Sequence, residues 1–544
     1  MANQATDFPL PADAAEAFYI WDKLHAPRAL TPLEHQTLVE ATGIGFSKAI
    51  GEMGSGIIAE CHMINFYNYL KGVPRELEPG DTPEQRAERY QKNAAELKPK
   101  LGDKWENEWL PKIKEQIARA KVSDYSGYSD AGLMSRFDEM VEETLYRWYV
   151  HGMLLYSFAA ANDFSDFFKE HVAEGSSMEG YEALQGFETE ATHSSRGLWQ
   201  LSRTVRNHAE LRSLFESTPP EELDGKLQAD QTGKAFLAQL DTYLEDYGWR
   251  SDSVYELTKP AWWEKREIPL GAVQGYVAIE DASSPDSQLQ SAIKRREELL
   301  QMAREKLADD AEKLAQFNAL YDAAKSFTPI VEDHNHWIDQ IGDISLRYPA
   351  LEIGKRLAAR GVIAEPEDVF MLRVEQLHEA MSGKDFKSHI ANLKADMDRF
   401  AKIVPPPFIG PPPPPSGDPV EDVLYRFFGT PVEPSTDPSV LSGIAASPGV
   451  VTGRAKVVRS LDEASKLQQG DIMVCEMTLP AWTPLFSTVS AVVSDTGGIL
   501  SHCAIVAREY RIPCVAGTAV GTSTIKDNQT ITVDGSKGLV RIES

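Results

Sequence analysis

The stretch that decides this fold is TGGILSHCAIVARE, residues 496–509. Its two glycines allow a sharp turn and leave backbone N–H groups uncovered. Ser501 is suited to cap the helix that the following small and apolar residues predict. His502 would then lie in the first helical turn, where free N–H groups and the helix dipole stabilise an anion, such as a phosphoryl group on the imidazole. A packed or capping histidine is the alternative interpretation.

The same stretch resembles the phosphohistidine signature T-G-G-x-x-S-H-x-A-I-x-A-R-E of the swivelling domain in the pyruvate phosphate dikinase and phosphoenolpyruvate synthase family. Further matches to this family occur in order at residues 447–455, 512–517 and 534–538. The resemblance implies that His502 is the phosphocarrier. Cys503 departs from the alanine usual at its position and puts a thiol beside the imidazole. The residues expected to bind the phosphate are Thr496, Gly497, Gly498, Ser501 and Arg508.

The composition is that of an ordinary soluble protein. With 82 acidic and 55 basic side chains the net charge is −27, so little of the surface would neutralise a phosphate backbone, and we expect no nucleic-acid partner. The lack of a long apolar run or a signal peptide predicts no membrane association. Four cysteines without C-x-x-C spacing favour a reducing cytoplasm and predict no structural zinc site. We expect no metal bound by this chain.

The chain divides into three predicted parts. Residues 1–403 carry apolar side chains at three- and four-residue spacing and predict a large, mainly α-helical substrate domain of one or two subdomains. Within it, the charged stretch 288–313 predicts a solvated helix or helical hairpin arm. Residues 404–440 contain proline runs and predict an extended hinge linker. Residues 441–544 alternate short β-like runs with two helical pieces, which predicts a compact β/β/α swivelling phosphohistidine domain.

The helical part resembles the substrate domain of rifampin phosphotransferases at residues 247–250, where those proteins have Y-G-H-R and this chain has Tyr-Gly-Trp-Arg. Trp249 replaces the histidine and would supply a flat apolar wall suited to an aromatic substrate. Arg250 is suited to stabilise charge on the transferring phosphoryl oxygens. Trp199, in a segment with the same resemblance, is a further predicted substrate contact. Packing in the core is the alternative for these tryptophans.

Residues 332–339, Glu-Asp-His-Asn-His-Trp-Ile-Asp, hold the predicted acid–base groups. On a helix, Glu332 and His336 would share a face, so the imidazole could accept a hydroxyl proton while the carboxylate orients it. A structural ion pair and a metal site are the alternatives for this spacing. The segment resembles an E-D-H-N tract of phenylphosphate-synthase-like subunits. His334 is the other candidate base, and Trp337 is a predicted substrate contact.

The opening of the chain contains a further candidate. Residues 21–27 read W-D-K-L-H-A-P and resemble the W-D-x-x-H-x-P pattern that precedes the first helices in substrate-binding subunits of the same broad family. His25 is therefore a predicted ligand contact. A structural histidine is the alternative interpretation.

We find no Gly-rich phosphate loop and no second large α/β domain before residue 441. We therefore expect a separate ATP-grasp-type subunit to bind ATP and Mg²⁺ and to phosphorylate His502. The resemblance is closest to phenylphosphate synthases, including 4-methylphenyl phosphate synthases. It implies transfer to a small phenolic substrate, which gives an aryl phosphate together with AMP and phosphate. The alternatives are another hydroxyl acceptor, such as an antibiotic, and a non-catalytic phosphorylatable adaptor.

Overall fold

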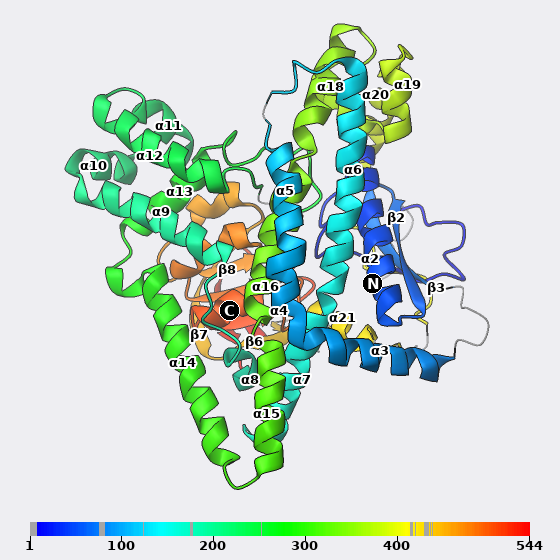
Figure 1. Cartoon of the computed structure of the whole chain (residues 1–544). Helices are drawn as coiled ribbons and strands as arrows, with labels where there is room; N and C mark the ends of the chain where they lie inside the picture. The colour runs from blue at the N-terminus through cyan, green and yellow to red at the C-terminus, as the bar shows by residue number, and fades with distance from the viewer. Residues whose placement is uncertain are drawn as a thin grey trace.

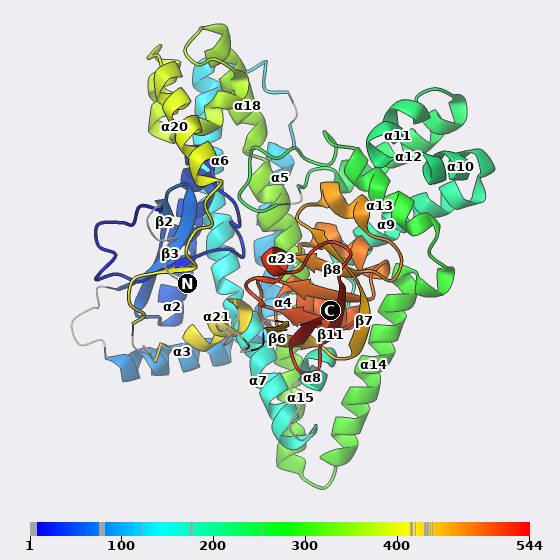
Figure 2. The same cartoon turned by 180° about the vertical axis from the view of Figure 1, so that it is seen from behind.

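Helices dominate the chain up to residue 400, and a β-rich domain follows and packs against them (Figures 1 and 2). This arrangement confirms the predicted fold class. No helix in the described part of the chain is both long and apolar enough to cross a membrane. The computed structural model of the 544-residue chain describes all residues except 1–7, 76–81, 123, 174–177, 252, 414–416, 419, 429–434, 436, 438 and 544, and leaves out the side chains of 422, 425, 427, 428, 462, 480 and 481.

The helical body is built on long helices that run through the centre of the molecule (Figure 1). α6 (Asp130–Met153) begins at Ser129, whose hydroxyl accepts a hydrogen bond from Gly132 N. A hairpin of α14 (Pro285–Lys306) and α15 (Ala311–Ala324) projects from the body, as predicted for the charged stretch. Other helices of the body are α2 (Ala41–Met53), α5 (Leu110–Ala120), α7 (Leu155–His171), α9 (Glu190–Asn207), α12 (Gln231–Tyr247), α13 (Glu267–Val277), α16 (Phe327–His334), the π-helix η5 (Asn335–Gln340), α18 (Arg347–Ala359), α19 (Val374–Met381) and α20 (Lys387–Phe400).

A four-stranded sheet in the N-terminal part is the main departure from the predicted helical domain. Its order is β2-β3-β1-β4, and β2 (Ile57–Ile64) forms an antiparallel hairpin with β3 (Tyr67–Pro74). β1 (Tyr19–Trp21) joins β3 to β4 (Phe408–Ile409). Seven of the eight residues of β2 are only partly buried, so the alternation of apolar and polar residues that reveals a strand is weak there.

Part of the predicted hinge, residues 404–440, is structured. β4 pairs with β1, so the chain returns to the N-terminal sheet before it enters the last domain. Asp418 accepts hydrogen bonds from Gly56 N (2.7 Å) and Ser55 Oγ (3.0 Å), and α21 (Glu421–Phe428) follows. The end of the second proline run and residues 429–434 lie outside the described residues. The domain boundaries and the hinge therefore stay predictions.

The C-terminal domain contains an eight-stranded sheet in the order β5-β12-β11-β7-β8-β9-β10-β6. Its centre is parallel, because β7, β8, β9 and β10 pair in that order. Every residue of β8 and β9 is buried, as is typical of parallel strands covered on both faces. The strands are β5 (Val440–Ser442), β6 (Ile444–Ser447), β7 (Val450–Val458), β8 (Ile472–Cys475), β9 (Ala491–Ser494), β10 (Cys514–Ala516), β11 (Thr530–Asp534) and β12 (Leu539–Ile542).

This domain is docked on the helical body (Figure 2). Its helix α22 (His502–Glu509) contacts α14, and its 3₁₀ segment η8 (Pro480–Ser487) contacts α9 and α13. The polar contacts between the parts include a hydrogen bond from Gln185 Nε2 to Ile505 O (3.1 Å) and the ion pair of Lys23 with Asp495 (3.0 Å). The seam between the two parts therefore contains the start of α22.

Candidate active site

His502 is the first residue of α22 and lies in the seam between the two parts of the molecule. Its side chain is 9% exposed, and its Nε2 lies 3.7 Å from Oε2 of Glu332 on α16. Nδ1 lies 2.9 Å from Thr478 Oγ1, Nε2 lies 3.3 Å from Thr483 Oγ1, and the edge of Phe486 faces the ring. Burial lowers the pKa of His502 to about 3, so the imidazole is neutral and nucleophilic at pH 7.

Glu332 is the group that the helical body presents to His502. It is 3% exposed, and its Oε2 has no hydrogen-bond partner among the described residues. Burial raises the pKa of Glu332 well above its ordinary value, and the carboxyl groups of Glu509 and Asp333 add to this shift. A buried carboxyl with a raised pKa beside a nucleophile is the kind of group that transfers protons near neutral pH.

The surroundings of His502 favour one tautomer. The raised pKa of Glu332 favours its protonated carboxyl, and a protonated carboxyl 3.7 Å from Nε2 favours a lone pair rather than a proton on that nitrogen. The proton of the ring then sits on Nδ1 and is donated to Thr478 Oγ1, while the Thr483 hydroxyl donates to Nε2. The Nε2 lone pair therefore faces the helical body. Sequence reasoning does not find the two threonines, since neither lies in a recognisable motif.

Glycines and hydroxyls build the loop before His502. Gly497 has φ of 97°, and a Cβ there would lie 2.7 Å from Ser501 Oγ. Ser501 occupies the predicted N-cap position, but its hydroxyl donates to Gly498 O (2.8 Å) and makes no capping bond. The Thr496 hydroxyl donates to Glu476 O (2.9 Å). These side chains are used within the loop, so the backbone N–H groups at the start of α22 are the donors left for a phosphoryl group.

Arg508, the other predicted phosphate ligand, holds α22 in place. Its Nη1 donates to Ala446 O and Ile499 O, both at 2.9 Å. Burial lowers the pKa of Arg508 to about 10, which leaves it charged at pH 7. Arg508 therefore ties the helix to β6 and to the carrier loop, and it makes no contact with His502 among the described residues.

The expected pairing of Glu332 with His336 is not formed. Glu332 Oε2 and His336 Nδ1 both lack a hydrogen-bond partner among the described residues, and the helix changes to the π-helix η5 at Asn335. His336 is buried beside Tyr247 and Trp337, with ring centroids 5.8 and 4.9 Å away. Burial holds the pKa of His336 well below its ordinary value. The structure therefore brings Glu332, rather than His336, to the carrier histidine.

Arg250 is almost fully buried in the body. Its Nη2 donates to Ser194 Oγ (2.6 Å), and its guanidinium lies 3.8 Å from the centre of the Trp262 ring. Nε and Nη1 have no hydrogen-bond partner among the described residues. Arg250 thus keeps donors for an anion, but no described contact joins it to His502.

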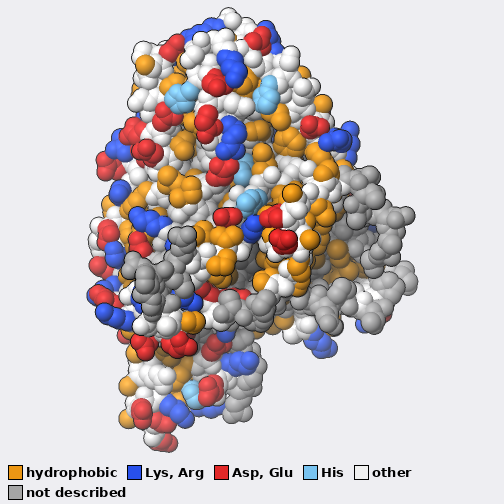
Figure 3. Space-filling view, turned by 90° about the vertical axis from the view of Figure 1, so that its right-hand side faces the viewer, with side chains coloured by type: hydrophobic (Ala, Val, Ile, Leu, Met, Phe, Trp, Pro, Cys, Tyr) orange, Lys and Arg blue, Asp and Glu red, His pale blue; other side chains and the backbone are white. Residues whose placement is uncertain are grey.

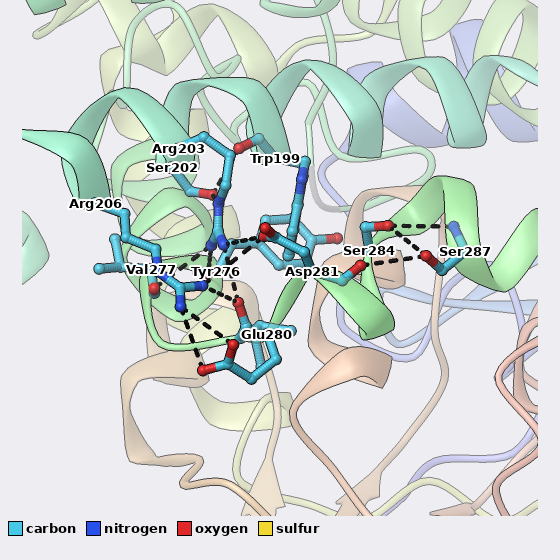
Figure 4. Close-up of polar contacts among 11 residues, drawn as sticks. Trp199, Ser202, Arg203, Arg206, Tyr276, Val277, Glu280, Asp281, Ser284 and Ser287 are labelled. Carbon is cyan, nitrogen blue, oxygen red and sulfur yellow. Dashed lines mark hydrogen bonds and ion pairs between the residues drawn. The ribbon is translucent and has the colours of Figure 1, made fainter.

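The three tryptophans predicted to bind substrate lie in different places. Trp249 packs against Trp263 and another aromatic ring, and Trp337 lies under the Lys114 ammonium at 4.4 Å. Trp199 carries the Arg203 guanidinium on its ring at 3.9 Å, within the polar network between α9 and the end of α13 (Figure 4). None of the three is among the described residues that line the large cleft of the molecule.

That cleft opens between the N-terminal sheet, α6 and the C-terminal domain and has a volume of about 2170 Å³. It reaches the carrier loop at Thr496, and His25, His151 and Tyr255 line it elsewhere. His25 is held by Asp22, with Nδ1 3.0 Å from Oδ1. His25 is thus a predicted ligand contact that does face a cavity.

The outer surface on the side of the N-terminal sheet is mixed in charge (Figure 3). Acidic and basic side chains alternate with hydrophobic ones, and no broad basic area gathers among the described side chains of this face. This face therefore offers little attraction to a polyanion.

Two family models match the chain. Residues 467–538 match the mobile domain of PEP-utilising enzymes, a segment that includes His502. Residues 149–332 match the fourth domain of rifampicin phosphotransferase, a segment that ends at Glu332. The chain therefore contains a PEP-utilising mobile domain and a rifampicin-phosphotransferase-like helical segment, and the two matches include both sides of the seam.

Several known proteins are similar to this chain. Chondramide synthase cmdD of Chondromyces crocatus is 32% identical over 98% of the chain, which covers 14% of that protein. The uncharacterized phosphotransferase YvkC of Bacillus subtilis is 32% identical over 70% of the chain, covering 46% of that protein. Rifampicin phosphotransferase of Streptomyces sviceus is 28% identical over 64% of the chain, covering 39% of that protein. The chain spans less than half the length of each of these relatives.

Proposed function

We propose that this protein is a phosphotransferase that carries a phosphoryl group on His502 and passes it to the hydroxyl of an acceptor held by the helical body. The observation that carries this proposal is the seam, where His502 Nε2 lies 3.7 Å from the buried Glu332 carboxyl. A nucleophile on one domain faces an acid–base group on the other, and both side chains are buried. The family matches on the two sides of the seam support the same class of reaction.

In the loading step, the Nε2 lone pair attacks the phosphorus of the donor, and the donor's P–O bond breaks. The Nδ1 proton stays on the ring beside Thr478, so the product is a phosphorylated imidazolium. The N–H groups and the dipole at the start of α22 stabilise the added negative charge. A separation of 3.7 Å leaves no room for a phosphoryl group between His502 and Glu332, so loading requires the C-terminal domain to move away from the body.

In the transfer step, the acceptor oxygen attacks phosphorus and the P–Nε2 bond breaks. The imidazole leaves as the neutral ring because it already has its Nδ1 proton. The proton of the acceptor hydroxyl goes to the ionised form of Glu332. The raised pKa of Glu332 makes its carboxylate a stronger base than an exposed one, which favours this transfer.

The acceptor that we propose is an aromatic or largely apolar alcohol. The resemblance of residues 332–335 to phenylphosphate-synthase-like subunits favours a small phenol, and the product would be an aryl phosphate. The cleft volume of about 2170 Å³ is larger than the roughly 300–1,000 Å³ of ordinary small-molecule sites. Among the described residues neither His502 nor Glu332 lines this cleft, so the second candidate, an antibiotic-sized acceptor, rests on the rifampicin named for several relatives.

The donor that we propose is ATP with Mg²⁺, bound by a separate ATP-grasp-type subunit. The test uses the full chain, ATP labelled at its β-phosphate and host extract as the source of donor. We expect acid-labile, base-stable label on the wild-type protein and none on His502→Asn, which keeps a polar side chain but removes the nucleophile. Label on the variant would refute the carrier assignment.

The labelled protein is then freed of nucleotide and mixed with phenol, 4-methylphenol or rifampicin. Loss of label with formation of the phosphorylated acceptor would identify the acceptor class. Label that persists with every acceptor would support a non-catalytic adaptor and would contradict the transfer step.

A further inference from the structure

Three side chains with metal-binding atoms meet beside the large cleft, and one of them, His151, lines it. They are His151 near the end of α6, His334 at the end of α16 and Asp339 in the π-helix η5. His151 Nε2 lies 3.9 Å from Asp339 Oδ1, and His334 Nε2 lies 3.9 Å from Asp339 Oδ2. The ligand atoms of all three lie within 4.8 Å of one another, and the two imidazole rings are 4.7 Å apart at their centres.

Hydrogen bonds on the side away from the centre of the cluster hold His334 and Asp339 in the orientation that a metal site needs. His334 Nδ1 lies 3.0 Å from Ile330 O and donates to it, so Nε2 is left as the ring's lone-pair atom. Asn335 Nδ2 donates to Asp339 Oδ2 (2.9 Å), and Gln340 Nε2 in turn donates to Asn335 Oδ1 (2.9 Å). Metal-binding histidines and carboxylates are oriented by hydrogen bonds of this kind.

The inner atoms, in contrast, lack partners. Asp339 is 3% exposed, yet its Oδ1 has no hydrogen bond among the described residues. Burying a carboxylate oxygen without a partner is costly, and a bound cation removes that cost. His151 Nδ1 also has no described partner. The unpaired carboxylate oxygen points to a ligand between the three side chains.

The cluster is separate from the carrier site. Glu332 and His334 lie two residues apart on α16, so they project to opposite sides of the helix. Glu332 faces His502, while His334 faces His151, which lines the cleft. An ion held here would therefore be reached from the cleft and not from the seam.

We propose that His151, His334 and Asp339 bind a divalent transition-metal ion of the Zn²⁺ type, with a coordination position open to the cleft. Two nitrogens and one carboxylate oxygen are a common protein ligand set for zinc with a free position. In tetrahedral coordination with bonds of about 2.0–2.2 Å, ligand atoms lie about 3.3–3.5 Å apart. The three ligand atoms lie within 4.8 Å of one another, with His151 Nε2 3.9 Å from Asp339 Oδ1, so side-chain rotations must bring them closer to reach that geometry. Imidazole ligands select against Mg²⁺, which prefers oxygen.

The test uses the tag-free full chain, stripped with a chelator and titrated with Zn²⁺ or Co²⁺ alone. We expect one ion per chain, an unchanged titration in the presence of excess Mg²⁺, and the visible absorption of four-coordinate Co²⁺. Asp339→Asn keeps the shape of the side chain and removes the carboxylate, so we expect binding to weaken by roughly 100-fold or more. Asn335→Ala removes only the orienting hydrogen bond and should weaken it by roughly 10–100-fold.

The matched control is His378→Gln, which removes an exposed histidine on α19 that pairs with Asp138 far from the cluster. It should bind Zn²⁺ as the wild type does. Circular dichroism of each variant checks that it is folded. A folded wild-type chain that takes up no Zn²⁺, or a folded Asp339→Asn chain that binds it as tightly as the wild type, would overturn the proposal.

Discussion

At the residue scale, the transfer step depends on which side chain receives the proton of the acceptor hydroxyl. The sequence alone favours His336 or His334. In the structure His336 lies beside Tyr247 and His334 faces the cleft, whereas Glu332 lies 3.7 Å from the carrier nitrogen. A base must be within hydrogen-bond reach of the proton that it takes. Of the three, Glu332 is the candidate nearest to the carrier nitrogen, so we propose it as the base that acts once the C-terminal domain has moved to make room for the phosphoryl group and the acceptor.

We predict that Glu332→Gln slows phosphoryl transfer from His502 to the acceptor by roughly 10²–10⁴-fold. The raised pKa of Glu332 fixes the sign of the pH dependence. Only the ionised carboxylate is a base, and its fraction grows with pH, so the wild-type transfer rate should rise through this pKa and then level off. The variant should lack that rise. Single-turnover discharge of labelled protein at a series of pH values measures both effects.

His336→Gln is the comparison that separates the two candidate bases. Both variants keep His502, so both should still be labelled by the donor. The opposite result would be a transfer rate that no longer rises with pH in His336→Gln but rises as in the wild type in Glu332→Gln. It would show that His336 is the base and would refute the assignment of Glu332.

At the scale of the element, the carrier loop depends on a backbone that only glycine adopts easily. Gly497 has φ of 97°, and an added Cβ would lie 2.7 Å from Ser501 Oγ and 2.8 Å from Ser501 Cβ. Gly497→Ala should therefore destabilise the C-terminal domain by roughly 1–2 kcal/mol from its backbone alone. It should also shift Ser501 and slow labelling of His502. Chemical denaturation and the initial rate of labelling measure these two effects.

Gly470→Ala is the matched control for this prediction. Gly470 has φ of 87°, but nothing lies within 4 Å of an added Cβ, and it precedes β8 rather than α22. It should lose a similar amount of stability and keep its labelling rate. Equal labelling rates in the two variants would show that the contact between Gly497 and Ser501 does not position the carrier histidine.

The carrier site contains features that the sequence predicts and features that it does not. The turn, the helix and His502 follow from adjacent residues, so local chemistry was enough to find them. The Glu332–His336 pair does not form: Glu332 Oε2 and His336 Nδ1 both lack a hydrogen-bond partner among the described residues, and Glu332 lies beside His502 instead. Thr478 reaches His502 through the fold of the domain, 24 residues away in the chain. Such contacts leave no periodic pattern in a single sequence.

At the scale of the molecule, buried acidic side chains lie on both sides of the seam between the C-terminal domain and the helical body. Glu509 lies on α22 and Glu332 on α16, and both line a cavity of about 30 Å³, enough for a water molecule. Burial raises the pKa of Glu509 to about 7, although the neighbouring Arg508 opposes the shift. Docking thus places two acids close together where their charged forms repel. Protonation of these groups should therefore favour the docked state.

We predict that docking weakens as pH rises. A group whose pKa is about 7 when docked and near 4.3 when exposed stabilises the docked state fully below about pH 4, and this contribution is lost by about pH 7. Between about pH 5.5 and 7.5 the docking constant should fall by roughly tenfold or more. Energy transfer between dyes on α14 and on the exposed edge of the C-terminal domain would follow the change.

Glu509→Gln cannot ionise, so it should remain docked at high pH and reduce the pH dependence to the part due to Glu332. Its labelling by the donor should slow at pH 8, because loading requires the domain to leave the body. Glu297→Gln, an exposed change on α14 away from the seam, should behave as the wild type does. A Glu509→Gln protein with the wild-type pH dependence would show that ionisation of this seam residue does not govern release. The movement between donor and acceptor would then need another cause, such as binding of the donor itself.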